Sequence, residues 1–269
     1  MIFTFIQLFL EYRRTDQISI LSVISNFIAG IFLASVLGLM FVQLPFSRGI
    51  RIGIGWLALF VIQEFSNIVE GYFFTTYLPT TYLFLAASLV GLLVTFIEAL
   101  VVVILFNPKE ALRSFRNDLR AYLGQRSWGL WILRIAVGSV AYFPIYFTFG
   151  ALISPFVLPY YQNSSMGLRI PSFAVMVPLE FARGFLYVTA LFPILVALRT
   201  QRKHTYAGIV SLLYIAGAFV PFLSGPTLPV QLRIFHGSEI LADCLAYGAV
   251  LVYLFRRNLN GERSPNSTE

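Results

Sequence analysis

Four ionisable side chains lie close together at the start of the last apolar stretch of the chain, in the segment RIFHGSEILAD. Arg233, His236, Glu239 and Asp243 recur every three or four residues, so on a helix they share an arc of about 120°. A histidine and a glutamate three residues apart can relay a proton, supply two metal ligands, or form a structural hydrogen bond. The spacing therefore predicts one polar wall of a site and leaves its chemistry open.

Half of the twelve acids of the chain lie in apolar stretches. The six are Glu64, Glu70, Glu98, Glu180, Glu239 and Asp243. Each acid costs about 2.5–3.5 kcal/mol at the middle of a membrane helix, so these groups must face inward, be paired, or be protonated. The fixed cations available in apolar stretches are Arg134, Arg183 and Arg233. The surplus of acids predicts carboxyl groups that carry a proton or bind a cation.

Two further segments carry polar groups toward the same end of their helices. In the second apolar stretch Gln63, Asn67 and Glu70 cover an arc of about 60°, and Glu64 lies about 9 Å deeper than Glu70. In the fifth, Glu180 precedes Arg183 by three residues. The last two could also form a simple intrahelical ion pair. The predicted ligand or proton site, in the extracytoplasmic half, comprises Glu64, Asn67, Glu70, Glu180, Arg183, Arg233, His236, Glu239 and Asp243. Pairing of Asp243 with Arg134 stays open, and Glu98 is expected to be unrelated to the site.

The elements that hold these residues are membrane helices. The 269 residues are 58% hydrophobic and only 12% charged, with a mean hydropathy of +0.79, which is typical of an all-α integral membrane protein. One bundle of seven spans is expected, at about 19–44, 50–74, 81–106, 128–150, 171–198, 206–224 and 231–255. Little chain remains for a second domain, so residues 1–269 form one polytopic domain.

The remaining segments are assigned from their length and from the residues that begin or interrupt helices. Residues 1–14 are too short to span and predict an interfacial helix, whereas 149–162 is interrupted by prolines and is interpreted as a re-entrant or surface segment. Residues 107–126 predict a cytoplasmic amphipathic helix, with Asn107 as its cap. Residues 257–269 are expected to be a flexible cytoplasmic tail.

Basic residues predict the orientation. Thirteen Lys and Arg residues of the loops fall on one side of a seven-span bundle and three fall on the other. By the positive-inside rule the C-terminus is cytoplasmic and the N-terminus is outside. The net charge of +7 then favours the lipid bilayer and anionic head groups at the cytoplasmic face as partners, and no nucleic acid. The default location is a prokaryotic plasma membrane.

A stripe of small and polar residues marks the first span. Ser22, Asn26, Gly30, Ala34 and Gly38 repeat at every fourth position, which allows two helix backbones to approach closely. The contact lies either within the bundle or between two protomers or a membrane partner. The polar pattern of spans one to three does not recur in spans five to seven, which lowers the support for a transporter built from repeats.

The chain lacks the residues that several specific activities require. Retinal binding requires a lysine in a span, and both lysines are in loops. A metal centre or a disulfide framework is not favoured, because only one histidine and one cysteine lie in spans. The chain has no P-loop and no GxSxG elbow in a suitable context. No cofactor and no metal are therefore expected.

Residues 179–184, LEFARG, are similar over one short stretch to the CPBP glutamic-type intramembrane proteases. Those enzymes carry paired glutamates followed by an arginine, and later Phe-x-x-x-His and His-x-x-x-Asn/Asp motifs. This chain has the single Glu180 with Arg183 three residues later, and Phe235 directly precedes His236. Membership of that family is not inferred, but a water activated by a carboxylate is compatible with these residues.

Three functions are compatible with these residues. The favoured one is binding or transport of a proton, a cation or a small cationic ligand, with Glu64, Glu180 and Glu239 as carriers. The second is an intramembrane hydrolase or peptidase acting on a lipid or a membrane peptide. It would use Glu180 or Glu239 as the base and His236 as the relay. The third is a structural subunit of a membrane complex, in which the ion pairs serve assembly alone.

Overall fold

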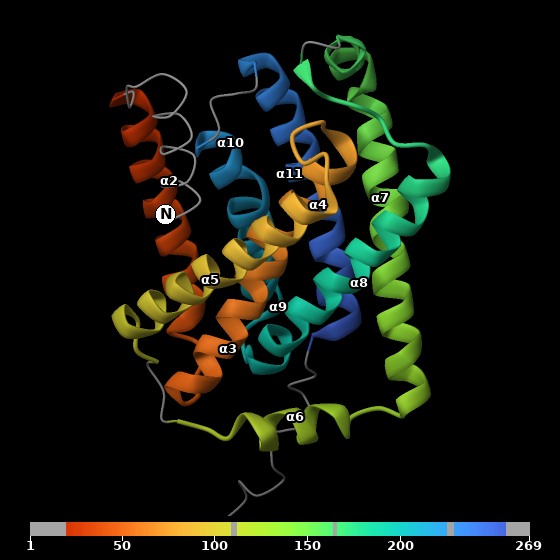
Figure 1. The fold of residues 1–269 in the computed structure, drawn as a ribbon. Helices are drawn as coiled ribbons and strands as arrows, with labels where there is room; N and C mark the ends of the chain where they lie inside the picture. Colours follow the sequence, from red (N-terminus) through yellow and green to blue (C-terminus); the bar gives the residue numbers. More distant parts are fainter. Residues whose placement is uncertain (1–19, 109–111, 164–165, 225–228, 257–269) are drawn as a thin grey trace, which may run out of the picture.

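The computed structural model describes residues 20–108, 112–163, 166–224 and 229–256. In these ranges the regular elements are all helices, and the one extended pairing is an isolated β-bridge between Thr75 and Leu168. The interfacial helix predicted at 1–14 and the tail predicted at 257–269 lie outside the described residues. Figure 1 shows the helices gathered in one bundle, with a short helix across one end.

Seven of the described helical segments are long and apolar enough to cross a membrane, which indicates a multi-pass membrane protein and confirms the predicted number of spans. Five are bounded as α2 (Ile20–Phe41), α5 (Thr81–Leu105), α7 (Trp128–Gln162), α8 (Phe173–Ala197) and α11 (Val230–Phe255). Two are composite. The second span joins α3 (Arg48–Leu59), the π-helix η1 (Phe60–Phe65) and α4 (Ser66–Phe74), and the sixth joins α9 (Arg202–Tyr214), the π-helix η3 (Ile215–Phe219) and α10 (Val220–Ser224).

The fourth span is longer than predicted. Residues 149–162 continue α7 as helix, so their interpretation as a re-entrant or surface segment is wrong. Pro155 has no N–H to donate to the carbonyl of Ala151, and the Ser154 hydroxyl donates to that carbonyl instead at 2.9 Å. Because the freed carbonyl has a new partner, the helix can pass through the proline.

The amphipathic helix near residue 115 is shorter than predicted. α6 (Phe115–Leu123) begins after Ser114, whose hydroxyl accepts from the Asn117 N–H at 3.4 Å. Residues 107, 108 and 112–114 are not helical, so the predicted cap at Asn107 is wrong. Ser114 and Asn107 are both residue types that favour an N-cap, and the helix begins after Ser114, seven residues later than predicted.

α6 packs on the end of the bundle. Asp118 is buried and pairs with Arg113 at 3.2 Å and with Arg199, which follows α8, at 2.9 Å. The fully buried Tyr122 donates a hydrogen bond to the carbonyl of Phe255, the last residue of α11. These contacts tie three parts of the chain together at this end, and Figure 1 shows α6 lying across it.

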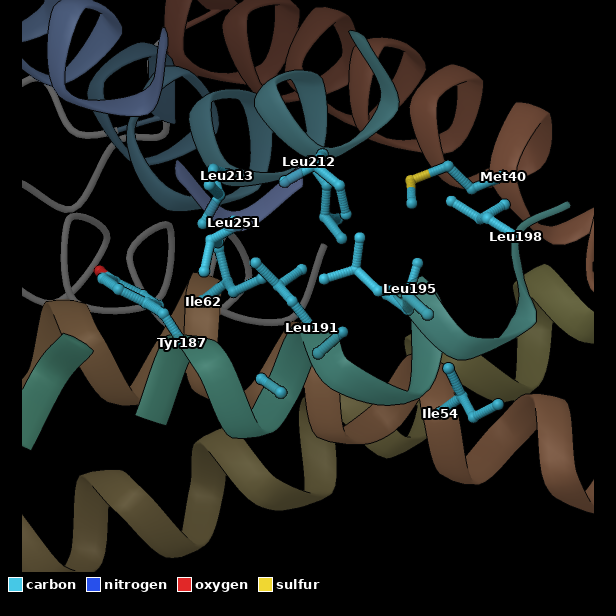
Figure 2. Packing of buried hydrophobic residues seen from close by; sticks show 14 of the residues in the cluster. Met40, Ile54, Ile62, Tyr187, Leu191, Leu195, Leu198, Leu212, Leu213 and Leu251 are labelled. Atoms are coloured by element: carbon cyan, nitrogen blue, oxygen red, sulfur yellow. The ribbon is translucent and has the colours of Figure 1, made fainter. Parts of the chain in front are cut away.

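The apolar core lies where α8 crosses the centre of the bundle. Figure 2 shows buried side chains from four helical segments meeting there, namely Leu191 and Leu195 of α8, Ile62 of η1, Leu212 of α9 and Leu251 of α11. Burial of such side chains against one another, instead of against lipid, depends on close packing more than on the hydrophobic effect.

α7 and α8 approach each other closely at a glycine. A Cβ atom on Gly184 would lie 2.1 Å from the backbone oxygen of Ser139, so the contact has no room for a side chain. The buried hydroxyl of Tyr247, on α11, donates to the carbonyls of Gly138 and Gly184, each at 3.1 Å. One tyrosine thus joins α7, α8 and α11 directly below the cavity described next.

The stripe on α2 is used within the chain at one end. A Cβ atom on Gly38 would lie 2.5 Å from the Phe106 ring, and Asn26 is buried. Among the described residues no neighbouring atom lies within 4 Å of the Cβ position of Gly30, Ala34 is half-buried, and the Ser22 side chain lies outside the described part. The stripe therefore serves an intrachain contact at Gly38 and is open at Gly30.

Candidate functional site

A cavity of about 350 Å³ lies in the half of the bundle remote from α6. Five of the membrane spans contribute to its walls: the second, with η1 and α4; the fourth, α7; the fifth, α8; the sixth, with η3 and α10; and the seventh, α11. The residues between α4 and α5 and the segment just before α8 also reach it, through Tyr77 and Leu168.

Seven of the nine residues predicted for the site line this cavity: Glu64, Asn67, Glu70, Arg183, His236, Glu239 and Asp243. Glu180 is fully buried beside Arg183 and is not part of the wall. Arg233 is half-buried and donates to the backbone oxygen of Phe222 at 3.3 Å, so it contacts a lining residue from outside. Groups distant in the sequence therefore meet around one space.

Arg183 is the fixed cation of the cavity wall. Its guanidinium donates to both carboxylate oxygens of Glu180, at 3.0 and 3.2 Å, and to Glu70 on α4 at 2.5 Å. Two carboxylates therefore surround one buried arginine. The intrahelical ion pair expected from the sequence is present, and Glu70 extends it to a second helix.

Three tyrosine rings surround the same guanidinium. The carbon at the centre of the Arg183 guanidinium lies 5.4, 5.9 and 6.0 Å from the ring centres of Tyr142, Tyr146 and Tyr187. These distances are within the range of cation–π attraction. Tyr247 packs edge-on against Tyr142, with ring centres 5.1 Å apart. The wall of the cavity is thus an aromatic surface that already holds one organic cation.

His236 lies in a chain of hydrogen bonds. Its Nδ1 is 2.8 Å from a carboxylate oxygen of Glu239, and its Nε2 is 3.3 Å from the hydroxyl of Tyr161 on α7. Tyr161 belongs to the segment that the sequence reading placed outside the fourth span. The imidazole is therefore held between a carboxylate of its own helix and a phenol of the neighbouring helix.

Asp243 has no partner in the described part of the chain. Its side chain lines the cavity in a residue that is 4% exposed, and its Oδ1 is buried without a hydrogen bond. Arg134, the partner left open by the sequence, donates instead to the carbonyl of Leu254 near the α6 end. A buried carboxyl group without a partner is costly, so this group needs a proton or a ligand.

Glu98 is linked to the site, which corrects the expectation that it is unrelated. The side-chain N–H groups of Gln63 reach Glu98 at 3.0 Å and Glu64 at 3.4 Å. Gln63 and Glu64 line the cavity, whereas Glu98 lies on α5 outside it. Depth along the helix does not predict this contact, whereas helix face does: Glu98 follows Gly91 by seven residues, and a Cβ atom on Gly91 would lie 3.1 Å from the side chain of Glu64.

The two π-helices meet at the cavity floor. Asn67 donates from its side-chain nitrogen to the carbonyl of Gln63 in η1, at 2.6 Å, and to that of Gly217 in η3, at 3.2 Å. A π-helix leaves a carbonyl without its usual i+4 partner, and such bulges are frequent at functional sites. One side-chain amide therefore bonds to both π-helices and joins spans two and six.

The sequence reading missed the aromatic wall. Six tyrosines line the cavity, Tyr77, Tyr142, Tyr146, Tyr161, Tyr187 and Tyr247, together with the buried free thiol of Cys244. The spacing of Tyr142 and Tyr146 by four residues was visible, but aromatic residues are so common in this chain that it did not stand out. No group of three or more His, Cys, Asp or Glu suitable for a metal occurs in the described ranges.

In comparisons with known protein families, curated proteins and solved structures, the chain matches none of them.

Proposed function

We propose that the protein binds a small organic cation in this cavity and moves it across the membrane. The observation that carries the proposal is Asp243, a buried carboxyl group that faces the cavity and has no described partner. Ionisable groups inside membrane helices mark ligand or ion pathways because their burial is otherwise unfavourable. Here a ligand cation would supply the missing charge.

The shape and chemistry of the cavity favour an organic ammonium group as the ligand. A bare ion would leave most of the space of about 350 Å³ unfilled. Tyrosine faces attract alkylated ammonium groups, and nearby carboxylates strengthen the interaction. The position of Arg183 among Tyr142, Tyr146 and Tyr187 supports this choice, because the same rings already attract one organic cation.

The carriers differ from those favoured by the sequence. Glu180 is neutralised by Arg183 and separated from the cavity, so Asp243, Glu239 and Glu64 take the ligand-binding role in the proposal. The same burial argues against Glu180 as the base of the hydrolase alternative, because a general base must reach the substrate, and leaves Glu239 with His236 for that role. A purely structural subunit would not need an unpaired buried acid facing a cavity.

Orientation and location belong to the same proposal. With the basic loops in the cytoplasm, the cavity lies in the extracytoplasmic half and receives its ligand from outside. The cell membrane is the proposed location, a prokaryotic plasma membrane by default. Anionic lipid head groups are proposed partners of the basic end. The open part of the α2 stripe around Gly30 is available to a second copy or a membrane partner.

Binding of tetramethylammonium to the purified protein tests the proposal. We expect saturable binding that weakens by about tenfold or more in Asp243→Asn, because a charge-assisted contact in a buried site is lost. Asp118→Asn is the matched control, since it removes a buried aspartate at the opposite end and should leave the affinity unchanged. Equal affinity in the parent and in Asp243→Asn would show that this carboxyl group does not bind the cation.

A further inference from the structure

A hydroxyl, an imidazole and a carboxylate form a continuous chain above Asp243. Tyr161 and His236 are 3.3 Å apart, and His236 and Glu239 are 2.8 Å apart. Glu239 precedes Asp243 by four residues on α11, which places the two carboxyl groups one above the other on the same helix face. The cation-binding function proposed above does not use the first two members of this chain.

Burial increases along the chain toward Asp243. The side chain of His236 is 21% exposed and that of Glu239 is 6% exposed, while Asp243 as a residue is 4% exposed. Gly150 on α7 packs closely against the inner end, since a Cβ atom there would lie 3.0 Å from a carboxylate oxygen of Glu239. His236 is therefore more exposed than Glu239, and Glu239 lies one helical turn from the unpartnered acid.

The geometry points to a proton relay through Tyr161, His236 and Glu239 that loads and unloads Asp243, so that a proton and the cation exchange at this carboxyl group. This inference rests on the proposed cation-binding function and adds its coupling to protons. Inward transfer moves the Tyr161 hydroxyl proton to His236 Nε2 and the Nδ1 proton to the Glu239 carboxylate. The Tyr161 oxygen takes a proton from water on the open side, and Glu239 passes its proton to Asp243.

The ionisable groups around Asp243 leave its carboxyl group to pair with either a proton or the cation. Glu239 faces it from α11, Arg183 and Glu180 from α8, Glu70 from α4, and Tyr142 from α7. The positive charge of Arg183 is offset by its two carboxylate partners, Glu180 and Glu70. A proton on Asp243 removes the charge that would hold the cation, so binding of the cation must release the proton.

Tetramethylammonium is suited to the test because it carries a permanent charge and no proton. In proteoliposomes we expect the parent to exchange labelled for unlabelled tetramethylammonium and also to accumulate it against a pH gradient. His236→Gln should keep the exchange and lose accumulation by about tenfold or more, because glutamine fills a similar space but cannot carry the proton. Accumulation by His236→Gln at the parental level would overturn the relay.

A neighbouring tyrosine supplies the matched control. Tyr160 also bridges α7 and α11, through a hydrogen bond from its hydroxyl to Gln231 at 2.6 Å, but it is not in the chain. Tyr161→Phe should lower gradient-driven accumulation while Tyr160→Phe should not. Equal losses in the two variants would indicate a purely structural effect and would contradict the relay.

Infrared spectroscopy tests the relay without any cation, so its failure can be told apart from failure of the proposed function. At acidic pH the parent should show a carboxylic acid band that disappears in Asp243→Asn. In deuterated water this band should shift about tenfold more slowly in His236→Gln than in the parent, because the route for the proton is removed. Loss of tetramethylammonium exchange with this result retained would overturn the cation but keep the relay. The absence of a band from Asp243, or equal rates in both proteins, would overturn the relay.

Discussion

Arg183 is the residue on which the buried charges of the site depend. It is 4% exposed and is the shared partner of Glu180 and Glu70. Removing one partner of a buried ion pair is more harmful than removing both, because it leaves a charge without compensation. The difference in stability between a single and a double variant therefore distinguishes a structural ion pair from carboxyl groups that bind a ligand.

We expect Arg183→Gln to lower the free energy of unfolding by about 3–5 kcal/mol, since it strands the Glu180 carboxylate in a fully buried place. The double variant Glu180→Gln/Arg183→Gln should be more stable than the single variant. Unfolding in detergent, followed by circular dichroism, measures both. A double variant less stable than Arg183→Gln would contradict the account of Glu180 as a carboxylate that depends on Arg183.

At the scale of elements, the two π-helices are the local departures from regular geometry that shape the cavity. Asn67 holds them together through the carbonyls of Gln63 and Gly217. The Asn67→Leu variant keeps the branched shape of the side chain and removes both hydrogen bonds. One intramolecular hydrogen bond contributes about 0.5–1.5 kcal/mol, so the loss of two should lower the free energy of unfolding by about 1–3 kcal/mol.

Hydrogen exchange locates this effect. Amides of residues 60–65 and 215–219 should exchange faster in Asn67→Leu, because the contact between spans two and six is weakened. Thr95→Val is the matched control: Thr95 is fully buried, but its hydroxyl donates only within α5, to Gly91 at 2.7 Å. Faster exchange confined to α4, with no change at 215–219, would show that Asn67 does not couple the two spans.

The spans could be predicted from the sequence because lipid imposes a length and an apolar composition on each helix. The hydrogen bonds by which side chains compensate for a proline in a helix could not be predicted. Ser154 gives the carbonyl of Ala151 the donor that Pro155 cannot supply, and α7 continues through this proline. Because α7 was shortened in the prediction, Tyr161 was absent from the predicted site, although its neighbour His236 was included.

The depth of a residue along its helix predicts the position of most site residues but not that of Glu98. Glu64, Glu70 and Asp243 were placed near one another from depth and helix face, and the structure brings them to one cavity. Depth alone separates Glu98 from them, but Gln63 bonds to it, because Glu98 shares the face of α5 on which Gly91 packs against Glu64. Which helix packs on that face depends on contacts between helices that one sequence does not reveal.

At the scale of the whole molecule, the two ends of the bundle differ in charge. The α6 end carries most of the described basic residues: Arg48, Arg51, Arg113, Arg116, Arg120, Arg126, Arg199, Arg202, Lys203 and Arg256. At the opposite end Arg169 hydrogen-bonds to the carbonyls of Tyr72 and Phe73. Near the basic end, burial and the neighbouring charge of Arg134 lower the pKa of Arg126. Strong like charge at one end favours its retention in the cytoplasm.

Labelling with a membrane-impermeant maleimide in intact cells tests the resulting orientation. In a Cys244→Ser background, which removes the buried thiol, Gln162→Cys at the end of α7 should react from outside and Arg116→Cys on α6 should not. Both positions are exposed, so lysis should make Arg116→Cys reactive as well. The reverse pattern in intact cells would place the cavity on the cytoplasmic side. The cation and the proton would then enter from within the cell, whereas the residues that bind them would be the same.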